Sequence, residues 1–223
     1  MTTRIAVAIS GRGSNLEALH GALKSSAAAK IVTVFSDRPD AGGLERARRW
    51  GITTEVLPNP ADGAVWIALL RRYSVDLVVL AGYVKLVPAN VIAAYRGRIL
   101  NVHPALLPAF GGKGMYGRRV HEAVLASGAR ETGATVHLVD EAYDHGATLA
   151  QARVPVFPGD TPELLAQRVL EAEHRLLPAV VLAAARAGRV VVLGESPAAS
   201  PQPPVKKESA SRLATDDWRL GSG

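Results

Sequence analysis

Short apolar runs alternate with longer segments of helical periodicity along the first half of the chain. The runs are continuous, which is typical of strands that are buried on both faces of a sheet. The pattern predicts strands at 4–10, 30–36, 53–57, 75–82 and 97–102.

Helices are predicted between these strands. Segments 16–26, 42–51 and 61–74 have helical periodicity, with Gly51 ending the second helix and Asp62 capping the third. Strands that are separated by helices indicate βαβ units, a mostly parallel sheet and helices on both of its faces. In such sheets ligands bind beyond the carboxyl ends of the strands.

The pattern changes in the second half of the chain. Segments 132–140 and 147–157 alternate apolar and polar residues between turn signals, which predicts an antiparallel pair added to the sheet. A long helix follows, capped by Asp160 or Thr161, and 189–194 is predicted to be a final strand.

The sequence changes composition again after position 194. Segment 195–223 is rich in proline and poor in apolar residues, which predicts an extended, flexible tail. We therefore expect one domain at 1–194.

The composition restricts the classes of ligand. Basic residues exceed acidic ones by 26 to 20, giving a net charge of +6, but they are scattered, and aromatic residues make up only 5%. Because few aromatic side chains are present on which bases could stack, the composition favours small anionic substrates over nucleic acid. The sequence has no cysteine, no signal-peptide pattern and no apolar segment of membrane-spanning length, so we expect a cytoplasmic protein.

The turn after the first strand, SGRGSN, suits a phosphate. Gly11 and Gly13 let the backbone turn tightly, and Ser14 and Asn15 can cap the next helix, so backbone N–H groups and the helix dipole face one point. Leu16 stands where a dinucleotide fingerprint needs glycine or alanine. We interpret the turn as a monophosphate site; the alternative is an ordinary strand-to-helix turn.

The strand at 97–102 ends in the sequence NVHP. Asn101 and His103 are two residues apart, so in a strand they project to the same side, and Pro104 ends the hydrogen-bond ladder. An amide and an imidazolium can both donate to an oxyanion, and the imidazole can also pass a proton. The pair indicates carbonyl-group transfer by direct attack of a substrate amine, although a lone structural histidine is the alternative.

Three carboxylates could complete such a site. Asp140 and Asp144 suit the turn DEAYDHG, but either one beside His103 would keep the imidazole charged, and the residues alone do not choose between them. Glu173 lies on the apolar stripe of the long helix, where it could contact an amine or hydroxyl of a ligand or reach water.

No metal site is expected. The histidines show neither of the helical spacings that are typical of paired metal ligands. His121, His137 and His145 lie near the motifs only along the sequence, and we assign no chemistry to them.

The chain resembles the folate-dependent phosphoribosylglycinamide formyltransferase family in five blocks that occur in the same order. The blocks are SGRGSN, AGYVKLVP, LNVHPALLPAFGG, TGATVHLVDEAYDHG and DTPELLAQRVLEAEHRLLP, and the resemblance covers residues 4 to about 194. It implies a Rossmann-like formyltransferase fold. It also implies formyl transfer from the cosubstrate 10-formyltetrahydrofolate to the amine of glycinamide ribonucleotide in de novo purine (IMP) biosynthesis.

The resemblance implies roles for individual residues on the acceptor side. Gly13, Ser14 and Asn15 would hold the ribonucleotide phosphate, and Glu173 would bind the glycinamide part. The half of the chain at about 1–100 would thus serve the ribonucleotide phosphate.

The half at about 101–194 would serve the folate and the chemistry. Asn101, His103 and Asp144 would be catalytic, with His103 as general acid and oxyanion stabiliser and Asp144 raising the pKa of that histidine. The folate-binding residues would be Val84, Lys85, Leu86, Val87, Asn101, Asp140, Glu141, Ala142, Tyr143 and Asp144.

Two features depart from the family pattern, and three rival functions compete with it. Segment 110–124 replaces a shorter loop, and Ala64 stands in place of a folate-binding arginine.

Formyltetrahydrofolate hydrolase and methionyl-tRNA formyltransferase would not need the phosphate turn, and a non-catalytic nucleotide-binding module would not need the catalytic residues. We expect small-molecule substrates, neither nucleic acid nor membrane as partner, and a monomer or a homodimer.

Overall fold

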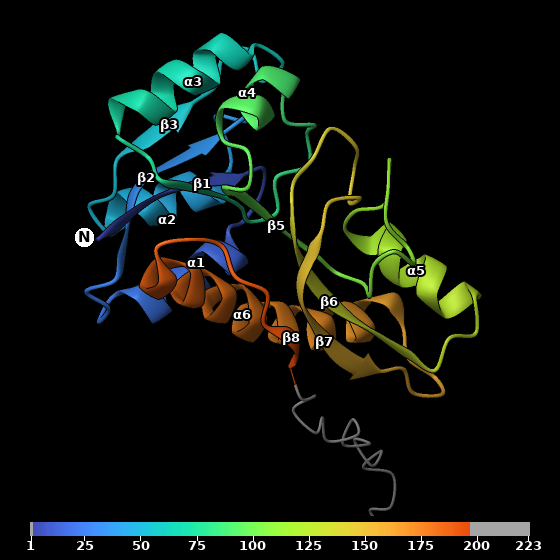
Figure 1. The fold of residues 1–223 in the computed structure, drawn as a ribbon. Helices are drawn as coiled ribbons and strands as arrows, with labels where there is room; N and C mark the ends of the chain where they lie inside the picture. The colour runs from blue at the N-terminus through green and yellow to red at the C-terminus, as the bar shows by residue number, and fades with distance from the viewer. Residues whose placement is uncertain (1, 197–223) are drawn as a thin grey trace, which may run out of the picture.

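One eight-stranded sheet runs through the structure, a computed structural model that describes residues 2–196 (Figure 1). The strands lie side by side in the order β3-β2-β1-β4-β5-β6-β7-β8. Their bounds are β1 Thr3–Ile9, β2 Ala29–Ser36, β3 Thr54–Val56, β4 Leu77–Leu80, β5 Ile99–His103, β6 Glu131–Leu138, β7 Thr148–Pro155 and β8 Gly194–Ser196.

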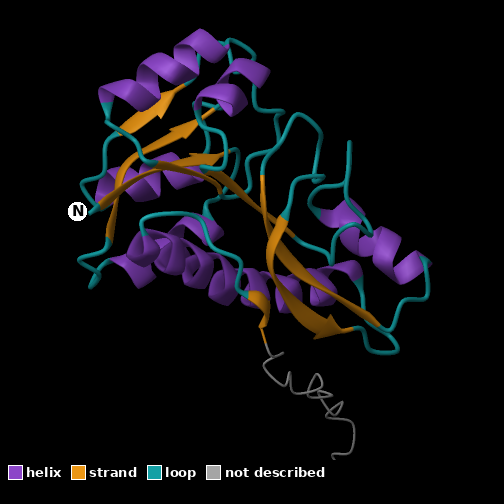
Figure 2. Ribbon diagram, viewed as in Figure 1, coloured by secondary structure: helices purple, strands orange, loops and turns teal. Residues whose placement is uncertain are grey.

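Helices cover both faces of the sheet (Figure 2). Helices α1, α2, α5 and α6 contribute to the larger core on one face, whereas α3 and α4 pack against the other face. Their bounds are α1 Ser14–Leu23, α2 Gly42–Arg49, α3 Gly63–Arg72, α4 Ala89–Ala94, α5 Arg118–Ala126 and α6 Pro162–Ala187.

Strand β1 shows why a continuous apolar run forms a central strand. Ile5, Val7 and Ile9 belong to the core on the α1 and α6 side, while Ala6 and Ala8 belong to the core on the α3 side. All of these side chains are fully buried. Both neighbouring strands, β2 and β4, pair with β1 in parallel, so the strand has no solvent-facing side or edge.

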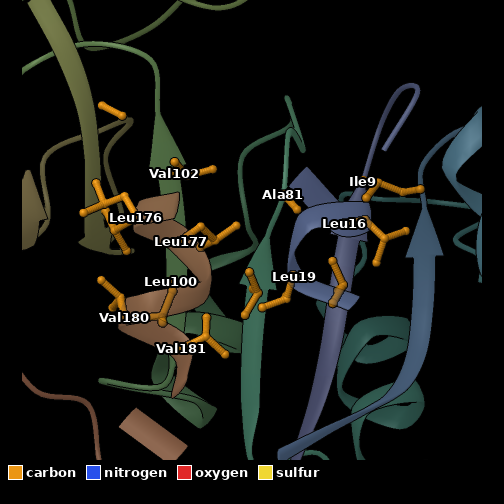
Figure 3. Packing of buried hydrophobic residues seen from close by; sticks show 14 of the residues in the cluster. Ile9, Leu16, Leu19, Ala81, Leu100, Val102, Leu176, Leu177, Val180 and Val181 are labelled. Atoms are coloured by element: carbon orange, nitrogen blue, oxygen red, sulfur yellow. The ribbon is translucent and has the colours of Figure 1, made fainter. Parts of the chain in front are cut away.

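The larger core holds α1 and α6 against the middle of the sheet (Figure 3). Leu16 and Leu19 of α1 and Leu177 and Val181 of α6 are fully buried there, together with Leu100 of β5. Because the two helices pack against each other, residues from the start of α1 can reach the middle of α6.

The first five strands are parallel, and the chain order reverses between β1 and β4. In parallel sheets such a reversal opens a crevice at the carboxyl ends of the strands. Strands β6 and β7 extend the sheet in antiparallel fashion. The predicted class, a mostly parallel α/β sheet with helices on both faces and an antiparallel extension, is confirmed.

The predicted strand at 189–194 is wrong. Residues 189–193 are irregular, and β8 begins only at Gly194. A strand needs a partner as well as β-branched residues, and the pairing with β7 starts where Gly194 lies opposite Ala150.

The predicted tail therefore starts too early, because residues 195 and 196 belong to β8, and the rest of it, 197–223, lies outside the described residues. The predicted halves, 1–100 and 101–194, contribute strands to the same sheet, and the division of roles between them stays a prediction. Among residues 2–196, no helix combines the length and the apolar character that crossing a membrane requires.

Candidate active site

A cavity of about 750 Å³ opens at the carboxyl ends of β1, β4 and β5. This volume lies in the range of small-ligand sites. The wall also includes the loop before α5, the loop after β6 and one side of α6. The predicted site residues on the wall are Ser14, Asn15, Val84, Lys85, Leu86, Val87, Asn101, His103, Asp140, Ala142, Tyr143, Asp144 and Glu173.

The predicted phosphate turn after β1 depends on glycine. Gly13 has a φ of 78°, and a Cβ atom on it would lie 2.8 Å from the Cα of Gly43, so a side chain would be both strained and in collision. The Gly43 N–H donates to the Gly11 carbonyl (3.1 Å), which presses the start of α2 against the turn. Ser14 and Asn15 reach the cavity from the first turn of α1, whereas Gly13 itself is buried.

Asn15 and Glu173 form a buried hydrogen bond in the cavity wall. Asn15 Nδ2 donates to Glu173 Oε2 (2.9 Å), and Asn15 Oδ1 has no partner among the described residues. Burial raises the pKa of Glu173 to about 7, although the Asn15 bond and the nearby His103 oppose this shift. The Asn15 amide therefore holds the Glu173 carboxyl group on the cavity wall, where it can accept N–H groups of a ligand.

Asn101, His103 and Asp144 converge as predicted. Asp144 Oδ2 lies 3.3 Å from His103 Nδ1, and Asp144 Oδ1 lies 3.3 Å from Asn101 Nδ2. Of the two aspartates that the sequence left open, Asp144 is thus the one beside His103. Asp140 instead lies 2.7 Å from the exposed His145.

Both ring nitrogens of His103 face oxygen atoms. Nδ1 lies beside Asp144, and Nε2 lies 2.8 Å from the carbonyl of Phe110. The doubly protonated ring is the form that satisfies both contacts. Phe110 and Asp144 have left-handed backbones, with φ of 57° and 54°, a conformation that costs about 1–3 kcal/mol per residue and clusters at functional sites.

Asp144 is held as an anion. Burial alone would raise its pKa, but the hydrogen bonds from His103 and from the Gly112 N–H (3.0 Å) outweigh that effect and hold the pKa well below its usual range. The carboxylate can therefore balance a positive charge on the His103 ring.

His137 belongs to the same cluster, so the interpretation that it lies near the chemistry only along the sequence is wrong. It stands opposite Asn101 in the β5–β6 register, and its Nε2 lies 3.1 Å from Asn101 Nδ2. Its Nδ1 lies 2.7 Å from the Leu138 carbonyl, so Nδ1 donates and Nε2 accepts. Both amide hydrogens of Asn101 thus have protein acceptors, and the 3.3 Å bond to Asp144 is the weaker one.

The charges on the cavity wall are unequally paired. Each carboxylate on the wall has a hydrogen-bonding or ion-pairing partner within the described residues. Within the same residues, no carboxylate forms an ion pair with Arg12, Lys85, Lys113 or Arg119, which are exposed. The uncompensated positive charge favours anionic ligands.

The predicted folate segments bring apolar side chains to the wall. Val84, Leu86 and Tyr143 are exposed there, which suits the apolar faces of an organic ligand. Glu141 differs from its neighbours, because it is not part of the wall and its carboxylate lies 3.9 Å from the guanidinium of Arg96.

His121 also lies on the wall, so the interpretation that it is near the chemistry only along the sequence is wrong as well. It comes from α5, a helix that the sequence analysis did not predict. Among residues 2–196, no cluster of three or more histidine, aspartate and glutamate side chains could hold a metal ion.

The fold and the cavity agree with one family of transferases. The sequence profile of the formyl transferase family matches residues 3–181, which places the chain among the formyl transferases.

Similar proteins narrow this class. The chain is 50% identical over 186 residues to the chloroplastic phosphoribosylglycinamide formyltransferase of Arabidopsis thaliana, covering 80% of this chain and 64% of that relative. It is 39% identical over 184 residues to the phosphoribosylglycinamide formyltransferase of Escherichia coli K12, covering 79% and 84%. The crystal structure of the Anaplasma phagocytophilum phosphoribosylglycinamide formyltransferase superposes with a TM-score of 0.78 at 38% identity, covering 84% of this chain and 88% of that one. The chain belongs to the phosphoribosylglycinamide formyltransferase family.

Proposed function

We propose that the protein transfers the formyl group of 10-formyltetrahydrofolate to the amine of glycinamide ribonucleotide, a step of de novo purine (IMP) biosynthesis. The observation that carries this proposal is the convergence of Asn101, His103 and Asp144 in the same cavity as Ser14 and Asn15. Groups that can stabilise an oxyanion thus lie near a helix start that suits a phosphate. The names of the relatives support the same substrates, although the chain spans only 64% of the Arabidopsis relative.

The chemistry follows from the charges of the cluster. The amine nitrogen bonds to the formyl carbon, the carbonyl oxygen becomes an oxyanion, and the bond from that carbon to N10 of the folate then breaks. His103, oriented by Asp144, exchanges the contact of its Nε2 with the Phe110 carbonyl for the oxyanion and, in the doubly protonated form, gives N10 its proton as general acid. Asn101 is the second donor, and it exchanges its 3.3 Å bond to Asp144 for the oxyanion. No covalent enzyme intermediate is needed.

The acceptor lies across the start of α1 and the middle of α6. Ser14, Asn15 and the backbone after Gly13 hold the phosphate, assisted by the exposed Arg12. Glu173, hydrogen-bonded to Asn15, accepts N–H groups of the glycinamide part. These roles explain why a carboxyl group is buried on an otherwise apolar stripe.

The folate cosubstrate lies along Val84, Lys85, Leu86 and Val87 and along the loop 140–144. Exposed apolar side chains in both segments suit the flat rings, and the uncompensated charge of Lys85 suits the carboxylates of the glutamate tail.

A formyltetrahydrofolate hydrolase is the alternative, because water could replace the amine at the same catalytic cluster. The Asn15–Glu173 pair favours transfer to an amine, since water needs neither that pair nor the phosphate turn.

The direct test uses purified protein, glycinamide ribonucleotide and 10-formyltetrahydrofolate. We expect the folate to lose its formyl group at the rate at which the nucleotide gains one, and no loss when the ribonucleotide is omitted. Formyl loss without the ribonucleotide would support the hydrolase, and no loss in either mixture would contradict both functions. A cytoplasmic location and a monomeric or homodimeric state stay predictions; the Arabidopsis relative is chloroplastic.

A further inference from the structure

His121 is a histidine of the cavity wall for which the mechanism above has no use. It lies in the first turn of α5, is only 4% exposed, and borders the same cavity as Asn101 and His103. Its neighbours on the helix, Val120 and Val124, are fully buried and fix the helix against the protein.

The ring of His121 lacks hydrogen bonds. Nδ1 is enclosed and has no partner, and Nε2 forms no hydrogen bond to any other residue in the range 2–196. Buried polar side chains are nearly always hydrogen-bonded, so an unbonded imidazole in a ligand cavity indicates that the ligand supplies the partner.

His103 and His121, two of the three imidazoles on the wall, have opposite environments. His103 lies between a carboxylate and a carbonyl oxygen, both of which favour a charged ring. Burial, and to a lesser extent the charge of His103, lower the pKa of His121, so its ring is neutral at physiological pH and keeps a lone pair. Paired titratable groups in such contrasting environments are typical of an acid and a base.

We propose that His121 is the general base of the formyl transfer, taking the proton that the attacking amine nitrogen loses on Nε2, the ring nitrogen that the protein does not enclose. The inference rests on the function proposed above. The new C–N bond forms as the carbon–N10 bond breaks, His103 gives its proton to N10, and His121 takes one from the amine nitrogen. Return of that proton from His121 to His103 resets the site, so protons balance over the cycle.

Glu173 is the other group that could take this proton. Its Oε2 already accepts the Asn15 amide, and with a pKa of about 7 its carboxyl group is partly protonated at neutral pH. Replacing each residue separately distinguishes the two.

The test compares His121→Gln with a matched control, His174→Gln. His174 is half-buried and, like His121, has one enclosed, unpartnered ring nitrogen (Nε2) and a pKa lowered mainly by burial, but it lies on α6 outside the cavity wall. We expect His121→Gln to lower kcat by about 10²-fold or more, with KM for both substrates within about 3-fold, because an amide cannot accept the proton. The His174→Gln variant keeps the wild-type kcat.

A second variant separates chemistry from structure. In His121→Ala the lost ring leaves space, and added imidazole is expected to restore part of the rate in proportion to its concentration, while the thermal midpoint of His121→Gln stays at the wild-type value. A kcat within 3-fold of wild type in His121→Gln, or a slow His121→Ala that imidazole does not rescue, would overturn the inference. These outcomes leave the proposed function standing, whereas a wild-type protein without formyl transfer would remove both.

Discussion

At the scale of single residues, the position of Asp144 brings one carboxylate between two histidines. Its carboxylate faces His103 and His137 at once, but Nδ1 of His137 donates to a backbone carbonyl, which leaves Nε2 of that ring as an acceptor. The left-handed backbone of Asp144 and the Gly112 N–H fix this orientation. One carboxylate thus contacts two rings that have different hydrogen-bond partners.

Removing either member of the His103–Asp144 pair is expected to abolish most of the chemistry. His103→Ala and Asp144→Ala should each lower kcat for formyl transfer by at least ~10²-fold, the usual effect of losing an acid or an oxyanion donor. Circular dichroism should show an intact fold in both. His20→Ala, which alters a half-buried histidine that stacks on Trp50 and does not line the cavity, serves as the control. Wild-type turnover in either site variant would contradict the mechanism.

Asn15 is expected to act on one substrate only. Asn15→Ala removes the amide that holds Glu173 in place, so KM for the ribonucleotide should rise by about 10-fold or more, the effect of one or two lost hydrogen bonds. KM for the folate should stay within about 2-fold. Steady-state kinetics with each substrate varied in turn provide the measurement, with Asn59→Ala as a control outside the wall. Equal changes in both KM values would show that the turn is only structural.

Sequence patterns located most of the candidate site residue by residue but left out two histidines. Strand periodicity places Asn101 and His103 on one side, and both reach the cavity. His137 could not be found in this way, because its contact with Asn101 depends on the register between β5 and β6, which no local pattern specifies. His121 was missed because its helix lies behind a glycine-rich loop without a clear period.

At the scale of elements, α6 joins the two ends of the site. It carries Glu173 at its middle and Glu163, the partner of Arg118 from α5, in its first turn. Thr161 caps it by accepting the Leu164 N–H (3.3 Å), as the sequence predicted. Asp160, the other predicted cap, instead binds Arg168 through two hydrogen bonds of 2.8 Å each.

The Asp160–Arg168 pair should anchor α6. The two side chains are only 1% and 12% exposed, so Asp160→Ala leaves a largely buried guanidinium without a carboxylate and should lower the free energy of unfolding by about 3 kcal/mol. Urea denaturation measures this. Glu45→Ala, in an exposed pair with Arg49, should change stability by less than about 1 kcal/mol. Equal effects of the two substitutions would mean that burial of the α6 pair adds nothing.

Most of the elements could be predicted from local patterns, and the two short elements that were not, α4 and β8, were missed for the same reason. The strands at the centre of the sheet are buried on both faces, so their apolar runs are unambiguous. The short α4 and β8 depend on tertiary packing, because six residues or three residues are too few to show a period. The run at 189–193 is β-branched but finds no partner strand.

At the scale of the whole molecule, the site lowers stability. Glu173 is buried, and burial raises its pKa from the ordinary 4.5 to about 7. Between these two pH values the folded protein holds a proton that the unfolded chain has released, so stability falls as pH rises through this window and the loss is complete above about pH 7. The protein thus tolerates an unfavourable carboxylate where we propose that the acceptor binds.

Glu173→Gln should therefore stabilise the protein in a pH-dependent way. Relative to wild type, its free energy of unfolding should increase by roughly 2–3 kcal/mol more at pH 8 than at pH 5, since one pKa unit corresponds to about 1.4 kcal/mol. Denaturant titrations at the two pH values measure the difference. Glu171→Gln, which changes an exposed acid on the same helix, should show no such dependence. A gain that is equal at both pH values would contradict the buried-carboxylate account.

The alternation of side chains along β5 has a consequence for how this protein can change over generations. Leu100 and Val102 belong to the larger core, while Asn101 and His103, which alternate with them, line the cavity. A slip of the strand by a single position would turn the reactive pair into the core and the core pair toward solvent. Selection for a well-packed core and selection for catalysis therefore both act on the register of β5. A change of that register would alter the core residues and the cavity residues together.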